Sequence, residues 1–470
     1  MGETYRSGQS VNRLARPKVI ALALATSALL LVTATALAAT GDLTQPAGTA
    51  GCVSEDGTGP CADGHGLIFP FSVAVSPDGK SVYVAGAGAV ARLNRNPTTG
   101  AISQPAGAAG CVSEDDHSDC ADGHGLGAPM AVVVSPDGKS VYVASLDDAV
   151  ARFNRNTTTG AISQPAGSAG CVSDEGAGPC ANGHALDAPS SVAVSPDGKA
   201  VYVASQFSDA VARLDRNTTT GAISQPGGGC ISESGAGGCA DGHALNGAAR
   251  VEVSPDGKNA YATSYVSDAL ARLNLNGNAN NGVISQPAGT AGCVSRTGSG
   301  GHCADGHALN DPFGVEVSPD GKSVYVASSS SDAVSRFNRN TTAGAISQPA
   351  GTAGCVSETG AGTCTDGRAL DGAGGVAVSP DGKSVYVASG GFTPDTYEGG
   401  ALARLNRSTT TGAITQPAGT AGCVSENGFG PCANGHGLGT AQWVAVSPDG
   451  GNVYVASAGS SAVARFNRAP

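Results

Sequence analysis

The sequence has few charged and few aromatic side chains, and these shortages exclude some classes of protein. Of its 470 residues, 14% are charged and 4% are aromatic, with one tryptophan, Trp443. The net charge is −12 and the body of the chain has no basic run. Nucleic-acid binding needs clustered Lys and Arg, so we expect no such partner. Glycine and proline make up about a fifth of the chain, less than in disordered low-complexity chains.

The N-terminus is the one place where basic residues precede a long apolar stretch. Arg13, Arg16 and Lys18 come before the apolar residues 19–39, which include the sequence Ala36-Leu37-Ala38. This order is typical of a secretory signal peptide. We predict a signal peptide at residues 1–38 and a mature domain at residues 39–470. The alternative is an uncleaved membrane anchor, because the stretch approaches the length that spans a bilayer.

Fourteen cysteines follow a regular spacing that predicts disulfide bonds in an exported chain. They form seven pairs separated by eight or nine residues, and the segment between each pair is called a Cys loop below. Each pair most simply closes its own loop, and bridges between neighbouring loops are the alternative. No C-x-x-C occurs, so we predict no zinc site. The pairs are Cys52 and Cys61, Cys111 and Cys120, Cys171 and Cys180, Cys230 and Cys239, Cys293 and Cys303, Cys355 and Cys364, and Cys423 and Cys432.

The sequence Ser-Pro-Asp-Gly recurs seven times and reveals one repeating unit of about 60 residues. Its copies begin at Ser76, Ser135, Ser195, Ser254, Ser318, Ser379 and Ser447. Pro suits the second position of a β-turn and Gly the last, so each copy predicts a tight reversal between two strands.

Each unit carries four strand signals and no helical period. In the second unit we predict strands at residues 132–134, 140–144, 149–154 and 161–164. Seven units of four short antiparallel strands are typical of a seven-bladed β-propeller. Residues 42–46 match a fourth strand alone, and the chain ends after a third strand. We therefore expect the N-terminal strand to complete the last blade and close the ring.

The repeat resembles a known family. The sequence Val-Ala-Val-Ser-Pro-Asp-Gly-Lys-Ser-Val-Tyr-Val-Ala-Ser is present nearly intact at residues 192–205 and 376–389. It resembles the YVTN-type repeat of lactonase-like seven-bladed propellers, which include the propeller type of 6-phosphogluconolactonase. The resemblance implies the propeller fold and a lactonase-like activity. The Cys loop departs from the ordinary YVTN unit.

Strand order places the Cys loops on one face, together with the loops between second and third strands. Six histidines and one arginine follow these loops at corresponding positions and are candidate ligand-binding residues: His65, His124, His184, His243, His307, Arg368 and His436. Such a set could ring the mouth of a central channel as an anion-binding rim. The favoured alternative is that each side chain ties its own loop by hydrogen bonds to carbonyl groups.

Departures from the repeat are the candidates for an asymmetric catalytic site. Glu252 and Glu316 replace the Ala or Val found in the innermost strand of the other units, and Arg250 lies two residues before Glu252. Paired carboxylates beside an arginine could carry out acid–base chemistry or hold a cation. A local ion pair or an exposed charge is the favoured alternative.

Loop acids such as Glu55, Asp56 and Asp63 are candidate calcium ligands, because carboxylates in Gly-rich loops suit Ca²⁺. Their positions vary between units, so a solvated acidic loop is the favoured interpretation, and no cofactor is predicted.

The sequence supports two hypotheses about function. The first is a secreted, periplasmic or cell-surface binding or scaffold propeller, a monomer without a membrane span after cleavage. It would bind an extracellular protein or glycan through the Cys-loop face. The second is a lactonase-like hydrolase with its site at Glu252 and Glu316.

Overall fold

The computed structural model describes residues 39–114, 119–275, 283–391, 399–428 and 430–470. Residues 39–470 form one compact unit. The predicted signal peptide at residues 1–38 lies outside the described residues. No helix within the described ranges is long and apolar enough to cross a membrane.

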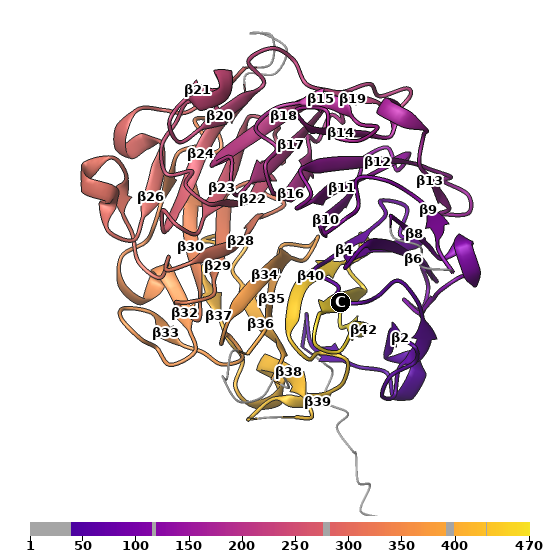
Figure 1. The fold of residues 1–470 in the computed structure, drawn as a ribbon. Coiled ribbons are helices and arrows are strands. Elements are labelled where there is room, and N and C mark those ends of the chain that lie inside the picture. Colours follow the sequence, from indigo (N-terminus) through magenta and orange to yellow (C-terminus); the bar gives the residue numbers. More distant parts are fainter. Residues whose placement is uncertain (1–38, 115–118, 276–282, 392–398, 429) are drawn as a thin grey trace, which may run out of the picture. The chain divides into compact units, whose positions relative to one another are not determined.

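The unit is an all-β, seven-bladed propeller, as the repeat predicts. Seven sheets follow one another around a centre, and their innermost strands contact one another in a closed cycle (Figure 1). These strands are β4 (Ser72–Val75), β10 (Pro129–Val134), β16 (Pro189–Val194), β22 (Ala248–Val253), β28 (Pro312–Val317), β34 (Ala373–Val378) and β40 (Ala441–Val446). They begin blades 1 to 7 in that order.

The second and third strands of each blade pair in an antiparallel register without irregularity. The second strands are β5 (Ser81–Gly86), β11 (Ser140–Ser145), β17 (Ala200–Ser205), β23 (Asn259–Ser264), β29 (Ser323–Ser328), β35 (Ser384–Ser389) and β41 (Asn452–Ser457). The third strands are β6 (Ala89–Arg95), β12 (Ala149–Arg155), β18 (Ala210–Arg216), β24 (Ala269–Leu275), β30 (Ala333–Arg339), β36 (Ala401–Arg407) and β42 (Ala462–Arg468).

The outer part of each blade differs from the predicted single fourth strand. Three short strands take its place, so each sheet has six strands. The first is β7 (Ile102–Ser103), β13 (Ile162–Ser163), β19 (Ile223–Ser224), β25 (Ile284–Ser285), β31 (Ile346–Ser347), β37 (Ile414–Thr415) or β1 (Leu43–Thr44). The second is β8 (Cys111–Ser113), β14 (Cys171–Asp174), β20 (Cys230–Ser232), β26 (Cys293–Ser295), β32 (Cys355–Ser357), β38 (Cys423–Glu426) or β2 (Cys52–Glu55). The third is β9 (Ala121–Asp122), β15 (Ala181–Gly183), β21 (Ala240–Asp241), β27 (Ala304–Asp305), β33 (Thr365–Asp366), β39 (Ala433–Gly435) or β3 (Ala62–Gly64).

The first two of these short strands pair with opposite ends of the same third strand. In blade 2, β13 pairs with residues 154–155 of β12, and β14 pairs with residues 149–151. A single 3-10 turn, η3 (Gly167–Ala169), lies between them. The Cys loop therefore begins inside the sheet, whereas the sequence predicted a loop outside it. The last short strand runs parallel to the second, so each blade is mostly antiparallel, as predicted, with one short parallel pair at its outer edge.

All seven disulfides close their own loops, as the spacing predicted. Each bond joins the two cysteines of one pair, and the Cα atoms of each pair are 4.7–4.8 Å apart. The bridge spans the short parallel strand pair and fixes it at the outer edge of the blade. Seven disulfides indicate that the chain folds in an oxidising compartment.

Blade 7 combines both ends of the described unit. Its sheet contains β40, β41 and β42 together with β1, β2 and β3, and Leu43 pairs with Arg468. The side chain of Arg404 in blade 6 also contacts the carboxylate of Asp42 at 2.6 Å. Strand pairing therefore ties the start of residues 39–470 to their end.

A repeated buried cluster, here called the Arg–Asp–Tyr clasp, joins neighbouring blades. In the clasp between blades 1 and 2, Nε of Arg155 donates to Oη of Tyr83 at 2.7 Å. The same guanidinium contacts both carboxylate oxygens of Asp78, in the Ser-Pro-Asp-Gly turn, at 2.9–3.0 Å. The Arg155 side chain is fully buried. The six clasp ion pairs are Arg95–Asp449, Arg155–Asp78, Arg216–Asp137, Arg339–Asp256, Arg407–Asp320 and Arg468–Asp381.

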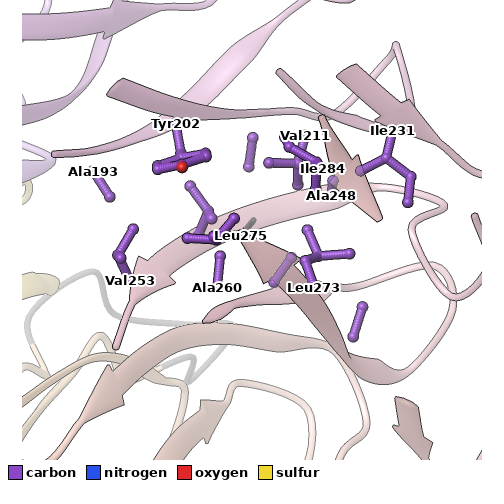
Figure 2. Close-up of a cluster of buried hydrophobic side chains, with 14 of the residues drawn as sticks. Ala193, Tyr202, Val211, Ile231, Ala248, Val253, Ala260, Leu273, Leu275 and Ile284 are labelled. Atoms are coloured by element: carbon purple, nitrogen blue, oxygen red, sulfur yellow. The ribbon is translucent and has the colours of Figure 1, made fainter. Parts of the chain in front are cut away.

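The boundary between blades 3 and 4 has no such arginine, because Leu275 stands at its position. Leu275 packs in an apolar cluster with Tyr202 of blade 3 (Figure 2). The turn carboxylate of Asp197 pairs instead with the exposed Lys199 in its own turn, at 3.8 Å. Apolar packing replaces the ion pair at this one boundary.

Candidate functional site

A cavity of about 270 Å³ lies at the centre of the ring, and the innermost strands of all seven blades line it. Most of its lining side chains are Val, Ala or Ser, because the repeat places small residues on this face. Four larger side chains break the pattern: Arg250, Glu252, Glu316 and Trp443. The structure thus brings together the three residues that the sequence analysis selected as departures from the repeat.

Glu252 and Glu316 occupy the same register position in neighbouring blades. Each lies opposite the tyrosine of its second strand, Tyr261 in blade 4 and Tyr325 in blade 5. Burial raises the pKa of Glu252 to about 8. Burial and the nearby charge of Glu252 raise the pKa of Glu316 well above its usual value, although a backbone hydrogen bond at Val378 opposes the shift. At neutral pH the pair therefore retains protons that exposed glutamates would release.

Arg250 is 3% exposed and its guanidinium lies close to two aromatic rings. Its Cζ atom is 4.7 Å from the ring centroid of Phe313 and 4.4 Å from that of Trp443. One terminal nitrogen donates to the carbonyl of Ser190, and Nε has no hydrogen-bond partner among the residues that the structure describes. Burial lowers the pKa of Arg250 to about 9.

Within the described ranges, Arg250 does not form the local ion pair with the glutamates that the sequence analysis considered. Among the ion pairs of the described ranges, none joins Arg250 to a carboxylate. The cavity therefore holds a guanidinium and a pair of acids that do not neutralise one another.

Sequence reasoning missed Phe313 and the position of Trp443. Trp443 occupies the register position of Arg250, where other blades carry small residues such as Ser72 and Gly375. A Cβ atom at Gly375 would lie 2.7 Å from the Cα atom of Trp443, so the glycine leaves room for the tryptophan backbone. The signal was present, because a lone Trp among Ser, Ala and Gly is as strong a departure as Glu252.

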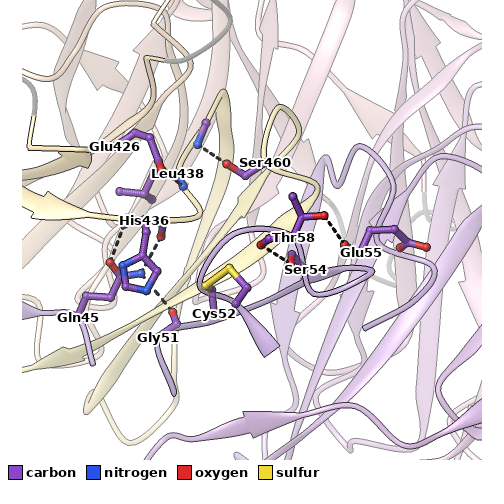
Figure 3. The surroundings of a disulfide bond; sticks show 12 residues. Gln45, Gly51, Cys52, Ser54, Glu55, Thr58, Glu426, His436, Leu438 and Ser460 are labelled. Atoms are coloured by element: carbon purple, nitrogen blue, oxygen red, sulfur yellow. Dashed lines mark hydrogen bonds between the residues drawn. A yellow bond between two sulfur atoms is a disulfide. The ribbon is translucent and has the colours of Figure 1, made fainter. Parts of the chain in front are cut away.

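The histidines lie between successive Cys loops and do not line the central cavity. A glutamine just after each first short strand clamps the backbone of each one. The side chain of Gln45, for example, accepts from the N–H of His436 at 2.9 Å and donates to its carbonyl at 2.8 Å (Figure 3). The same amide also donates to the carbonyl of Gly51, next to the following disulfide.

The clamp recurs at all seven positions, including the one that carries arginine. Its pairs are Gln104–His65, Gln164–His124, Gln225–His184, Gln286–His243, Gln348–His307, Gln416–Arg368 and Gln45–His436. Because the glutamine binds main-chain atoms, Arg368 can replace histidine without loss of the clamp. These residues are not among those that line the central cavity. The tie that the glutamines form runs between loops, whereas the favoured alternative placed a tie within one loop.

A second hollow, of about 520 Å³, lies beside the outer parts of blades 5 and 6 on the Cys-loop face. Its lining includes Arg368, Glu358, Asp371 and Glu426. Burial is the main cause that raises the pKa of each of these three acids. The long sixth-blade loop borders this hollow at Gly391 and Gly399, and residues 392–398 lie outside the described part of the chain.

The acids of the Cys loops do not gather into a metal site within the described ranges, where no group of three or more candidate ligands occurs. Glu55, for example, accepts a hydrogen bond from the backbone N–H of Leu67 at 2.6 Å. Corresponding acids in other loops make the same contact, as Glu426 does with Leu438. Their structural role is therefore to tie the loop to the segment that follows it.

Comparison with known proteins agrees with the resemblance seen in the repeat. Residues 73–235 match the family model described as "Lactonase, 7-bladed beta-propeller". A "putative 6-phosphogluconolactonase" structure from Bacteroides uniformis has 18% identity and a TM-score of 0.51, covering 84% of this chain and 91% of its own. Another from Bacteroides fragilis has 17% identity and a TM-score of 0.48, covering 74% and 82% respectively.

No curated protein matches the chain at a significant level. At these low identities the structural likeness shows the fold alone. The seven described blades show a seven-bladed propeller, and the match over residues 73–235 makes it similar to the lactonase-type propeller family, with a disulfide added to each repeat.

Proposed function

We propose that this chain is an exported binding propeller that holds an extracellular protein or glycan on its Cys-loop face. The observation that supports this proposal is that each Cys loop is attached to the next one around the ring. Each loop is closed by its own disulfide and clamped to the next loop by a glutamine. Loops fixed before binding lose little conformational entropy when a partner arrives, which favours affinity.

The tips of these loops are available to a partner. In the third Cys loop residues 177–179 are exposed, and residues 236–238 are exposed in the fourth. The side chains of these tips are small and uncharged, and the chain carries a net charge of −12. Such a surface suits a hydroxyl-rich glycan or a basic protein better than an anionic polymer.

The binding proposal can be tested with lysine substitutions at equivalent loop tips. Ala177→Lys, Ala236→Lys and Ala361→Lys change exposed residues and keep the disulfides. Thr219→Lys adds the same charge to an exposed turn on the opposite face. Binding of residues 39–470 to isolated cell-wall glycan and to a basic protein, measured by surface plasmon resonance, should fall about tenfold in the loop variants.

The Thr219→Lys control should bind as the unmodified chain does. Equal loss in the control and the loop variants would show a general charge effect and contradict the use of the Cys-loop face. Retention of neither probe by the unmodified chain would count against the binding function itself.

A second candidate function, lactone hydrolysis, is favoured by the glutamate pair in the central cavity. A carboxyl group with a raised pKa can protonate a leaving oxygen, while an ionised partner activates water. A panel of small lactones offered to residues 39–470 tests this candidate. Turnover that is lost in Glu252→Gln and Glu316→Gln, but kept in the exposed control Glu175→Gln, would establish hydrolysis. No turnover of any lactone would leave the binding function as the better explanation.

A further inference from the structure

The central cavity has a basic end and an acidic end on the same strand. Arg250 and Glu252 are two residues apart on β22 in a regular stretch of its register. Side chains at i and i+2 of a strand point to the same face, about 7 Å apart along the strand. Both therefore face the cavity, and Glu316 adds a second carboxyl group at the level of Glu252.

The basic end, Arg250, forms no ion pair with any described residue. A guanidinium has five N–H donors, and among the described residues Arg250 donates one hydrogen bond, to the carbonyl of Ser190. The rings of Phe313 and Trp443, whose centroids lie 4.7 Å and 4.4 Å from Cζ of Arg250, supply no carbonyl or carboxylate acceptor. A buried cation without a paired anion is costly. A carboxylate in the cavity would supply the missing acceptors.

The acidic end, formed by Glu252 and Glu316, can accept a cation when its carboxyl groups ionise. Glu252 and Glu316 repel one another when both are ionised, and Arg250 does not neutralise them. A cation between the two carboxylates would remove this repulsion. An ammonium group has three donors and suits a site with two carboxyl groups.

We propose that the central cavity binds a small zwitterion, with its carboxylate on Arg250 and its ammonium between Glu252 and Glu316. A ligand with only one charge would leave the opposite end of the cavity unpaired. The cavity of 270 Å³ equals the liquid volume of about nine water molecules. It therefore suits a short ω-amino acid such as 5-aminovalerate, whose charges lie at opposite ends. This site is separate from the Cys-loop face and does not depend on the function proposed for that face.

Three compounds of equal length test the proposal on residues 39–470: 5-aminovalerate, valerate and pentylamine. Trp443 is the only tryptophan in the chain and touches Arg250, so its fluorescence reports occupation of the cavity without any substitution. We expect 5-aminovalerate to bind at least about tenfold more tightly than either singly charged compound. Isothermal titration calorimetry measures the same order of affinities independently.

Substitutions at each end separate the two contacts. Arg250→Gln should reduce binding of 5-aminovalerate to the level of pentylamine, and Glu252→Gln with Glu316→Gln should reduce it to the level of valerate. The exposed control substitutions Arg296→Gln and Glu175→Gln should leave binding unchanged. Circular dichroism of each variant confirms that it is folded before binding is compared.

Three outcomes overturn the proposal. Valerate binding as tightly as 5-aminovalerate would show an anion site only, and equal binding of pentylamine would show a cation site only. Absence of any fluorescence change or heat with 5-aminovalerate up to about 10 mM would show that the cavity does not take this class of ligand. None of these results bears on binding at the Cys loops, which is measured with different probes and variants.

Discussion

The Arg–Asp–Tyr clasp offers the sharpest test of what holds the ring together. Arg155→Leu reproduces in blade 2 what the chain already has at Leu275 in blade 4. The substitution removes the bonds from Arg155 to Asp78, to Oη of Tyr83 and to the carbonyl of Gly138. It leaves the strands and the turn sequence unchanged, so the effect should come from the boundary between two blades.

The expected loss follows from the burial of the two partners. Removing one partner of a buried ion pair costs about 3–5 kcal/mol, because the other charge stays without its partner. The side chain of Arg155 is fully buried, whereas that of Asp78 is 28% exposed, so water can solvate the remaining carboxylate. We therefore expect the lower end of the range, about 3 kcal/mol of unfolding free energy.

Urea unfolding of residues 39–470, followed by circular dichroism, measures this loss. A double-mutant cycle with Asp78→Asn isolates the pair, because the second substitution removes the carboxylate that the first leaves without its partner. The double variant should lose less stability than the sum of the two single losses. A loss below about 1 kcal/mol for Arg155→Leu, or strict additivity in the cycle, would refute the view that the clasp stabilises the ring.

Three further predictions concern the cavity, the disulfides and the last blade. Burial raises the pKa of Glu252 to about 8, so the folded chain keeps a proton that the unfolded chain loses above about pH 4.5. Stability should fall as pH rises from about 4.5 to 8, and Glu252→Gln should remove about 3 kcal/mol of that fall at pH 7. An unchanged pH profile in urea unfolding would contradict the raised pKa. Cys171→Ser with Cys180→Ser opens one disulfide loop and should cost about 2–3 kcal/mol, while circular dichroism shows intact sheets. Loss of the β signal would instead place that loop in the core. Deletion of residues 39–45 removes β1 and its pairing with β42, and the melting temperature should fall. An unchanged melting temperature would show that this strand does not hold the last blade.

The strands within each blade could be predicted from the sequence because local signals determine them. The turn Ser135-Pro136-Asp137-Gly138 separates two strands, and these strands consist mainly of β-branched and small residues. The predicted strand at residues 140–144 differs by one residue from β11, which ends at Ser145. The innermost strand extends three residues further than predicted, to Pro129, because the register shift near its start weakens the alternation.

The outer part of the blade could not be predicted because its pairing is not local. Cys171 and Val172 gave no alternating run long enough to indicate a strand. Their pairing with β12 and with the parallel β15 depends on how the chain returns to its own sheet. The disulfide could be assigned from spacing, but its place inside the sheet could not.

The candidate site likewise has features that the sequence could predict and features that it could not. Glu252, Glu316 and Arg250 could be found as departures from the repeat, and the structure places all three in one cavity. The histidines illustrate the limit of that method. A repeating sequence shows that His65 and its counterparts share an environment, but it does not say whether that environment lies at the channel or between loops.

The sequence by itself determined the blade count, the grouping of the cysteines into seven closely spaced pairs and the residues that break the symmetry. These features depend on spacing and turn chemistry, which act over a few residues. The tertiary structure alone decided which groups meet across blades: Arg155 with Asp78, Gln45 with His436, and Arg250 with Phe313 and Trp443. The physical reason is that these contacts form only after the ring brings distant segments together, and burial then sets their charges and strengths.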